Sequence, residues 1–465
     1  MCARAGGLKG EFPNQATKKV GIKRVFDNRM LRRLILPLAV EQMLIVLVAM
    51  FNVMLIASAG EEAVSGISLV DMIDAVVLNV FAALAAGGAV VTAQYIGHQE
   101  KDNACEAASQ LMVVTICISV CIMALVLLPR QHLFTLFYGR VDSGVLQNAM
   151  AYFQWVAFSY PFLAVYYACA AVFRAMGNSK TPMLLSLGLY LSSITGSVLA
   201  VFVFKAGIYG VAFSIFLARV IASVVIFALM QNKRLPVHGD IRQMRRFNFA
   251  MIRRILHIGV PNGLENGIFN LGRVLVVGVI ASFGTVQMAA NAVANNLDSL
   301  GCIPGQAMNL AMLTVVGQSV GAGDYRAVES QIRKLMKISY IAGAVWNVLI
   351  LLSLNTILGL YNLSPETISL SYILVMIHNG CGIFLWPLSF TLPNALRASN
   401  DVHYAMVVSI FSMIVFRVVF SFILGKNLGW GAIGVWEAMI LDWIFRVILF
   451  TGRFLRGKWK LQRVL

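Results

Sequence analysis

Long apolar stretches separated by short polar segments run along the chain from about residue 34 to residue 451. Each stretch has about 20 residues or more, the length of helix that crosses the hydrocarbon core of a bilayer. The pattern therefore predicts an all-α, polytopic membrane protein with twelve transmembrane helices. We expect them at about 34–57, 67–95, 108–128, 149–172, 183–204, 211–230, 255–281, 286–316, 335–358, 368–394, 404–424 and 431–451.

Composition supports the same class. Of the 465 residues, 59% are hydrophobic and 12% are charged, whereas soluble domains carry roughly 25% charged residues. The seven cysteines form no CxxC pair, and most of them lie inside apolar stretches. We therefore expect neither a disulfide framework nor a metal site.

Basic residues alternate from one side of the predicted membrane to the other. The segments on the side of the two termini hold 29 Lys and Arg, and the opposite connections hold four: Arg130, Arg140, Lys205 and Lys426. By the positive-inside rule we expect both termini to lie in the cytoplasm. We also expect a multi-pass protein of the plasma membrane. The net charge of +17 is thus explained by topology, so we expect membrane lipid and no nucleic acid as a partner.

The polar segments are too short for a soluble domain. Residues 231–254 form the longest connection between predicted spans, and the chain has no GxxxxGK[ST] phosphate-binding loop. Any uphill work would then draw on an ion gradient or on a partner.

An internal repeat divides the chain into halves. When the chain is aligned with itself so that Pro37 falls on Pro261, Gly97 falls on Gly321, and equivalent pairs recur through six spans. The repeat predicts an N-terminal six-helix lobe at 34–230, a cytoplasmic linker at 231–254 and a C-terminal six-helix lobe at 255–451, flanked by cytoplasmic segments 1–33 and 452–465. An even number of spans in each half makes the repeat parallel, and transporters of this kind carry substrate between the halves.

Two carboxylate pairs are duplicated by the repeat. Glu41 and Glu265 each lie four residues after a proline, and Asp74 corresponds to Asp298. A charge at the bilayer centre costs about 2.5–3.5 kcal/mol, which favours a functional role. The alternative for each residue is a buried ion pair or an interhelical hydrogen bond.

Further polar residues share faces with these carboxylates. Asn262 lies three residues before Glu265, and Asn291, Asn295 and Asp298 follow a helical spacing. These amides extend the predicted ion or substrate site. Arg273 is a possible counterion of Glu265, whereas three arginines closer to span ends are expected to reach the membrane surface: Arg219, Arg417 and Arg446.

Several motifs resemble the multidrug and toxic compound extrusion (MATE) family. They include Gln94-Tyr95-Ile96-Gly97, Phe173–Ser179, Gly317–Gly321 and Asn394–Asp401, and the resemblance extends from about residue 30 to 455. It implies two lobes forming a V, and export of organic cations in exchange for H⁺ or Na⁺.

This chain also departs from the family pattern at three positions. Asn52 stands where many members have an aspartate late in the first span, and Phe269 stands where the seventh span usually has a glutamate. Glu265 would have to take the place of that glutamate. Trp386 stands where some Na⁺-coupled members have a carboxylate in the tenth span.

These observations together predict a monomeric secondary antiporter that exports a small organic, cationic substrate by alternating access. Its ion and substrate site comprises Glu41, Asn52, Asp74, Asn262, Glu265, Asn291, Asn295 and Asp298, with H⁺ or Na⁺ as coupling ion and no cofactor. The principal alternative is a flippase for a lipid-linked or amphiphilic substrate, which would need basic residues for phosphate. An intramembrane enzyme is disfavoured because Asp71-Met72-Ile73-Asp74 is a single DxxD motif, and a channel is disfavoured by the repeat.

Overall fold

A computed structural model describes residues 26–57, 61–128, 143–361 and 363–462. These residues form helices and contain no strand, which confirms the all-α prediction. The first half comprises α1 (Asn28–Ala57), α2 (Glu61–Gly97), α3 (Lys101–Leu127), α5 (Ser143–Phe158), α6 (Tyr160–Ala175), α7 (Lys180–Val198), η1 (Leu199–Val203) and α8 (Gly207–Met230).

The second half repeats this series after a short helix, α9 (Ile241–Met244). It comprises α10 (Phe249–Ala281), α11 (Thr285–Gly301), α12 (Ile303–Gly321), α13 (Tyr325–Gly359), α14 (Pro365–Trp386), η2 (Pro387–Thr391), α15 (Leu392–Ala398), α16 (Val402–Ser412), η3 (Met413–Val419), η4 (Ser421–Asn427), α17 (Gly431–Leu455) and η5 (Lys458–Leu461). The segments η1 to η4 are π-helical continuations of their neighbours, and η5 is a 3₁₀ turn.

In the part of the chain that the structure describes, apolar helices of membrane-spanning length account for ten of the twelve predicted stretches, all but the first and the last. Within the described residues, eight helical segments are long and apolar enough to span a bilayer, and two bent pairs raise the number to ten. The pairs α5–α6 and α11–α12 bend by 46° and 45°. Pro161 and Pro304 stand in the first turn after each break, where a proline removes one backbone hydrogen bond.

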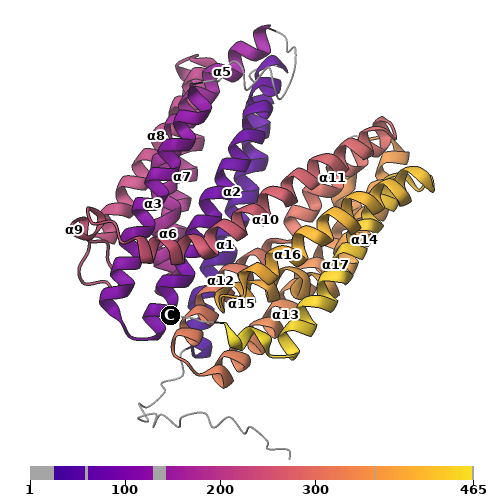
Figure 1. Ribbon diagram of the computed structural model, residues 1–465. Helices are drawn as coiled ribbons and strands as arrows, with labels where there is room; N and C mark the ends of the chain where they lie inside the picture. The colour runs from indigo at the N-terminus through magenta and orange to yellow at the C-terminus, as the bar shows by residue number, and fades with distance from the viewer. Residues whose placement is uncertain (1–25, 58–60, 129–142, 362, 463–465) are drawn as a thin grey trace, which may run out of the picture.

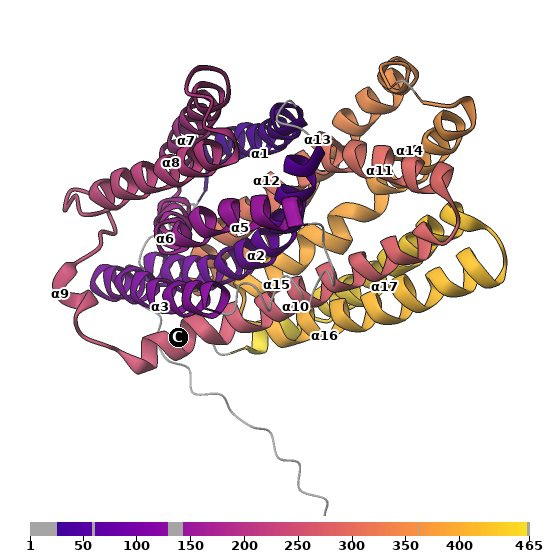
Figure 2. The same ribbon diagram turned by 90° about the horizontal axis from the view of Figure 1, so that it is seen from above.

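The helices form two groups that diverge from a common end (Figure 1). We call α1–α8 the first lobe and α10–α17 the second lobe. The end of α17 and the beginning of α1 lie at the joined end, and the view from above shows the lobes side by side (Figure 2). The helices α10 and α12 of the second lobe pack against α2 of the first lobe. A buried cluster that joins both lobes includes Val90, Met112, Ala311 and Leu396.

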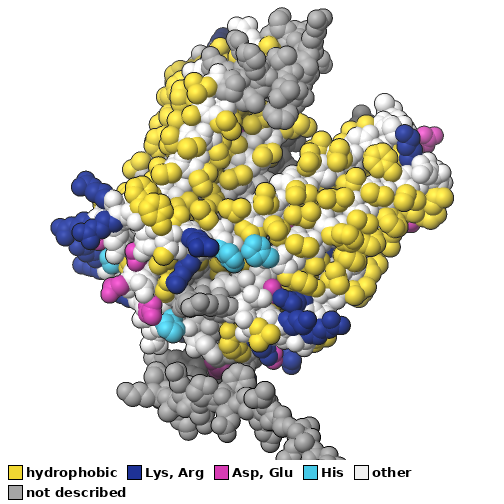
Figure 3. All heavy atoms as spheres, in the orientation of Figure 1, with side chains coloured by type: hydrophobic (Ala, Val, Ile, Leu, Met, Phe, Trp, Pro, Cys, Tyr) yellow, Lys and Arg dark blue, Asp and Glu magenta, His cyan; other side chains and the backbone are white. Residues whose placement is uncertain are grey.

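The outer surface separates apolar from charged regions. Hydrophobic side chains cover both arms, whereas Lys, Arg, Asp, Glu and His gather near the joined end (Figure 3). Leu271 and Leu352, for example, are 61% and 79% exposed. An apolar exterior of this extent suits a lipid environment, since soluble proteins rarely expose such large patches.

Candidate ion and substrate site

The lobes meet through a crossing of α2 and α12. Gln94 Nε2 donates to the carbonyl oxygen of Ala398 in the opposite lobe at 2.9 Å. Gln318, its counterpart in the repeat, donates to the carbonyl oxygen of Ala175 at 2.6 Å. The two contacts are therefore equivalent under the pseudo-twofold relation of the lobes.

Two glycines allow this close approach. A β-carbon at Gly97 would overlap the carbonyl oxygen of Gln318, and one at Gly321 would overlap that of Gln94. Only residues without a side chain fit at these two points. His98 Nδ1 also lies 3.2 Å from the carbonyl oxygen of Gly321. Polar contacts as well as packing therefore hold the two lobes together at the joined end.

The duplicated glutamates are both held by arginines. Glu41 Oε1 accepts from Arg174 at 2.6 Å, and Glu265 Oε1 accepts from Arg397 at 2.5 Å. Both glutamates are buried. The sequence interpretation counted Arg174 and Arg397 among the cytoplasmic charges, whereas both point inward and their side chains are 14% and 11% exposed. Their equivalent positions in the repeat were the signal that could have identified them.

Arg397 also corrects the expected counterion of Glu265. The carboxylate pairs with this residue of α15 and forms no ion pair with Arg273 in the described structure. Arg273 instead lies next to a small pocket between α10, α11, α17 and η3.

Asp74 has a different partner from its counterpart in the second lobe. Its Oδ2 accepts from Arg219 at 3.0 Å, and Arg219 also donates to Ser159 at the break between α5 and α6. The expectation that Arg219 reaches the membrane surface is wrong, because this side chain is 14% exposed and its charge is neutralised inside the lobe. Asp71 lies one turn earlier on α2 and is exposed.

Asp298 pairs with a histidine. His378 Nε2 lies 2.6 Å from Asp298 Oδ1, and its Nδ1 lies 2.8 Å from Asn379 Oδ1. The ring tautomer decides which nitrogen donates; when Nδ1 donates to the amide oxygen, Nε2 and the carboxylate share one proton. The sequence alone does not identify His378, because a single histidine within an apolar stretch is not recognisable as the partner of a distant carboxylate.

A thiol joins the same cluster. Cys302 Sγ donates to Asp298 Oδ1 at 3.1 Å, and the ligand atoms of Cys302, Asp298 and His378 lie within 4.8 Å of one another. These are the residues of the described chain that could hold a metal ion. In the present arrangement the thiol is a hydrogen-bond donor and so carries its proton, whereas a metal ligand is a thiolate.

The predicted amide stripe follows Asp298 along α11. Asn291 is buried, and its Oδ1 accepts from the indole nitrogen of Trp436 at 3.0 Å. Asn295 donates to the carbonyl oxygen of Asn291. Both amides line a cavity of about 50 Å³ together with Arg273 and Arg417. The structure thus brings Asn291, Asn295 and Asp298 onto one helix, as the spacing predicts.

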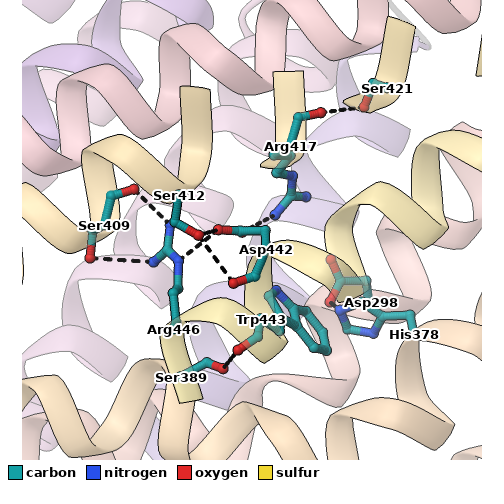
Figure 4. A network of polar contacts seen from close by, with 10 residues as sticks. All are labelled: Asp298, His378, Ser389, Ser409, Ser412, Arg417, Ser421, Asp442, Trp443 and Arg446. Atoms are coloured by element: carbon teal, nitrogen blue, oxygen red, sulfur yellow. Dashed lines mark hydrogen bonds and ion pairs between the residues drawn. The ribbon is translucent and has the colours of Figure 1, made fainter. Parts of the chain in front are cut away.

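A buried charge network lies beside this cavity (Figure 4). Asp442 Oδ1 accepts from Arg446 Nε at 2.9 Å and from the Ser412 hydroxyl. Arg446 also donates to Ser409, whereas Arg417 is 4.0 Å from Asp442 Oδ2. The expectation that Arg417 and Arg446 reach the membrane surface is therefore wrong.

The carboxylate of this network was overlooked in the sequence. The spacing of four residues between Asp442 and Arg446 was the signal that could have identified the pair, since residues i and i+4 lie on one helix face.

Two remaining predicted residues lie apart from these clusters. Asn262 is half-buried on α10, one turn before Glu265. Asn52 belongs to α1, and its side chain lies outside the described part of the structure. An apolar groove of about 480 Å³, with Val40, Ile303 and Ile341 in its wall, is also separate from these clusters.

Curated transporter sequences are similar to this chain along most of its length. The chain is 24% identical over 443 residues to "Probable multidrug resistance protein NorM" of Thermotoga maritima (93% of each chain) and 23% identical over 433 residues to "Uncharacterized transporter YisQ" of Bacillus subtilis (91% of this chain, 93% of the relative).

Solved structures agree in fold. One is described as "Outward-facing conformation of a multidrug resistance MATE family transporter of the MOP superfamily" (TM-score 0.87, 18% identity, 95% and 99% of the two chains). Another, from Pyrococcus furiosus, is described as "Reverse polarity of binding pocket suggests different function of a MOP superfamily transporter" (TM-score 0.86, 18% identity, 94% and 97%).

The family model MatE matches residues 37–199 and 261–423, one block in each lobe. The matched blocks begin at Pro37 and Pro261, which are the residues that the internal repeat pairs. Together these matches show that the chain belongs to the MATE family of multidrug efflux transporters and is not an enzyme.

Proposed function

We propose that the protein is a secondary antiporter that exports small organic molecules with a cationic group in exchange for H⁺ or Na⁺, by alternating access. The observation that carries this proposal is the symmetric crossing at Gln94 and Gln318, from which the two lobes diverge. Because each lobe offers the other the same contact, the lobes can part there and close at the other end by a rotation.

The orientation follows from the charges of the connections. We propose a monomer in the plasma membrane with both termini in the cytoplasm and anionic lipid around the basic end, where lysines and arginines gather in Figure 3. The diverging ends of the two lobes would then face the outside. The predicted lobe limits of 34–230 and 255–451 and the linker at 231–254 belong to this proposal.

We assign ion coupling first to Asp298 and His378. In this proposal the pair shares one proton, and loss of that proton would leave a carboxylate facing a ring lone pair at 2.6 Å. The pair must therefore separate or take up another cation, Na⁺ included, when the proton leaves. That requirement links occupancy of the site to a change of structure.

Glu265 and Glu41 receive a supporting role. A proton on either glutamate would leave Arg397 or Arg174 as an unpaired buried charge, which is costly. These pairs can take part in transport only when the arginine also moves. Asp74, with Asp71 nearby, gives the first lobe two carboxylates against Arg219, which favours a cationic group of the substrate on that side.

Proteoliposomes with separately imposed gradients test the proposal. Efflux of a cationic dye should follow either the H⁺ or the Na⁺ gradient and should be lost when that gradient is dissipated. Asp298→Asn and His378→Gln should both abolish the gradient dependence. Asp102→Asn, a change near the start of α3, is the matched control and should leave it unchanged. Full gradient-driven efflux by both site variants would refute the assignment.

A further inference from the structure

We propose that the pocket between α10, α11, α17 and η3 is an anion site, which holds either a halide ion or the carboxylate group of a transported amphoteric molecule. Its polar lining consists of two guanidinium groups, two amides and one indole: Arg273, Arg417, Asn291, Asn295 and Trp436. No carboxylate lines this pocket among the described residues. The identification of the substrate group rests on the proposed antiport, whereas anion binding does not.

Arg417 is the principal donor. Among the described residues its guanidinium has no acceptor within hydrogen-bond distance, and its Nε is buried without one. Arg417 Nη1 forms an ion pair with Asp442 Oδ2 at 4.0 Å, beyond hydrogen-bond distance, and Asp442 Oδ1 accepts from Arg446 and Ser412. The remaining contact of Arg417 is with the face of the Phe269 ring, 5.4 Å from the centroid. A buried guanidinium with unused N–H groups is a strong site for an anion.

The orientation of Asn291 supplies a second donor. Because Trp436 donates to the Oδ1 atom, the amide must present its NH₂ group elsewhere. Asn291 lines the pocket with that group free of any protein acceptor in the described structure. Trp436 thus acts as a positioning residue for the amide.

The charges around the pocket favour an anion as well. Arg273, Arg417 and Arg446 bring three positive charges, against the carboxylates of Asp298 and Asp442. An Asp298–His378 pair with one proton on Nδ1 and one between Nε2 and the carboxylate adds no net charge. The three arginines then exceed the carboxylate of Asp442, and a bound monovalent anion would lower this excess of positive charge.

The polar lining of this pocket is not duplicated by the internal repeat. In the alignment of the two halves, Arg273 corresponds to Ala49 and Asn291 to Ile67, whereas Trp436 corresponds to Ala212. These three residues thus have apolar counterparts in the first lobe, although the Glu–Arg pairs are preserved in both. A structural need common to the lobes would not explain donors present in one of them alone.

The size of the pocket limits what it can hold. Its volume of about 50 Å³ exceeds the roughly 30 Å³ share of one water molecule. A halide or a carboxylate group fits, and an entire drug-sized molecule does not. Because Arg273 is exposed at its edge, the remainder of a substrate could extend outward from the pocket.

Binding is measured first, without any gradient. Purified protein in detergent and a chloride-free zwitterionic buffer is titrated with bromide and with acetate, following tryptophan fluorescence, and Trp436→Phe identifies the signal from the pocket. Saturable quenching or competition is expected in the wild type. Arg417→Gln and the isosteric Asn291→Asp should weaken it about tenfold or more. Lys426→Gln, which removes an exposed charge from η4, should not change it.

The outcomes are distinct. Absence of saturable binding, or unchanged binding in both Arg417→Gln and Asn291→Asp, overturns the anion site. A second assay compares efflux of rhodamine B, which has a free carboxylate, with that of its ethyl ester, rhodamine 3B. A selective loss of rhodamine B efflux in Asn291→Asp assigns the site to a substrate carboxylate, and chloride dependence of both dyes assigns it to a halide. If neither dye is transported but bromide binds, the antiport proposal fails and the anion site stands.

Discussion

The two lobes agree in the contacts that hold them together and differ in the chemistry they enclose. Both retain the buried Glu–Arg pair and the glutamine at the crossing, at equivalent positions of the repeat. In contrast, Asp442 and Arg446 of the second lobe correspond to Ala218 and Ala222. The comparison indicates that the duplicated Glu–Arg pairs and glutamines serve the architecture, whereas groups that differ between the lobes, such as the partners of Asp74 and Asp298, are the better candidates for ion and substrate binding.

The lobes also differ in the helix that carries the aspartate. Asp74 lies within the continuous helix α2, whereas Asp298 lies at the end of α11, four residues before the break at Cys302. Pro304 stands in the first turn after the break, and its counterpart in the first lobe is Val80. At the break, the carbonyl oxygens of Leu300 and Gly301 accept hydrogen bonds from the side chains of Trp346 and Asn347. The backbone next to Asp298 can therefore adapt more easily than the backbone next to Asp74.

The largest expected effect separates the two aspartates. Asp298→Asn should abolish gradient-driven efflux and flatten its pH dependence, because the amide cannot share a proton with His378. Asp74→Asn should retain gradient dependence, since Arg219 stays charged whatever the gradient. The measurement is dye efflux from proteoliposomes between pH 6 and 8. Equal loss in both variants would contradict the proposed division between the lobes.

The next effect should be the same in both lobes. Glu41→Gln and Glu265→Gln each leave a buried arginine unpaired, which costs roughly 3–5 kcal/mol. Thermal unfolding in detergent should show similar losses of stability for the two variants. A double variant, Glu265→Gln with Arg397→Met, should recover much of the loss. Stability unchanged by Glu265→Gln would favour a role in ion binding alone.

The crossing glycines should show a smaller and again symmetric effect. Gly97→Ala and Gly321→Ala force the carbonyl of the opposite helix to move, at about 1–3 kcal/mol by analogy with overpacked cores. Both should shift the protein towards opening of the joined end, measured by labelling of cysteines introduced at Asp102 and Asp324. Gly343→Ala is the control, because no atom lies within 4 Å of its added β-carbon. Normal labelling in both variants would contradict a closed crossing.

The smallest effect should reveal a slight asymmetry. Gln94→Ala and Gln318→Ala each remove a hydrogen bond across the lobes, at about 1 kcal/mol. Gln94 also donates to Asn400 at 3.0 Å, so its loss should lower the unfolding temperature slightly more. A larger effect at Gln318 would show that the crossing is not organised as described.

The helical fold could be predicted from the sequence because each span is a continuous apolar stretch long enough to cross a bilayer. It also identified the four carboxylates, since the repeat doubles them. It did not identify their partners: Arg174 and Arg397 were counted as cytoplasmic charges because a count by segment does not record where a side chain points. Asp442 was missed because it has no duplicate in the first lobe.

The α2–α12 crossing also bears on how the halves of the gene can diverge. The space available at residue 97 is set by the backbone at residue 318, and the space at residue 321 by the backbone at residue 94. Mutational drift in either half is therefore constrained by the other. A chimera that combines halves of two relatives should assemble only when both parents keep glycine at these positions.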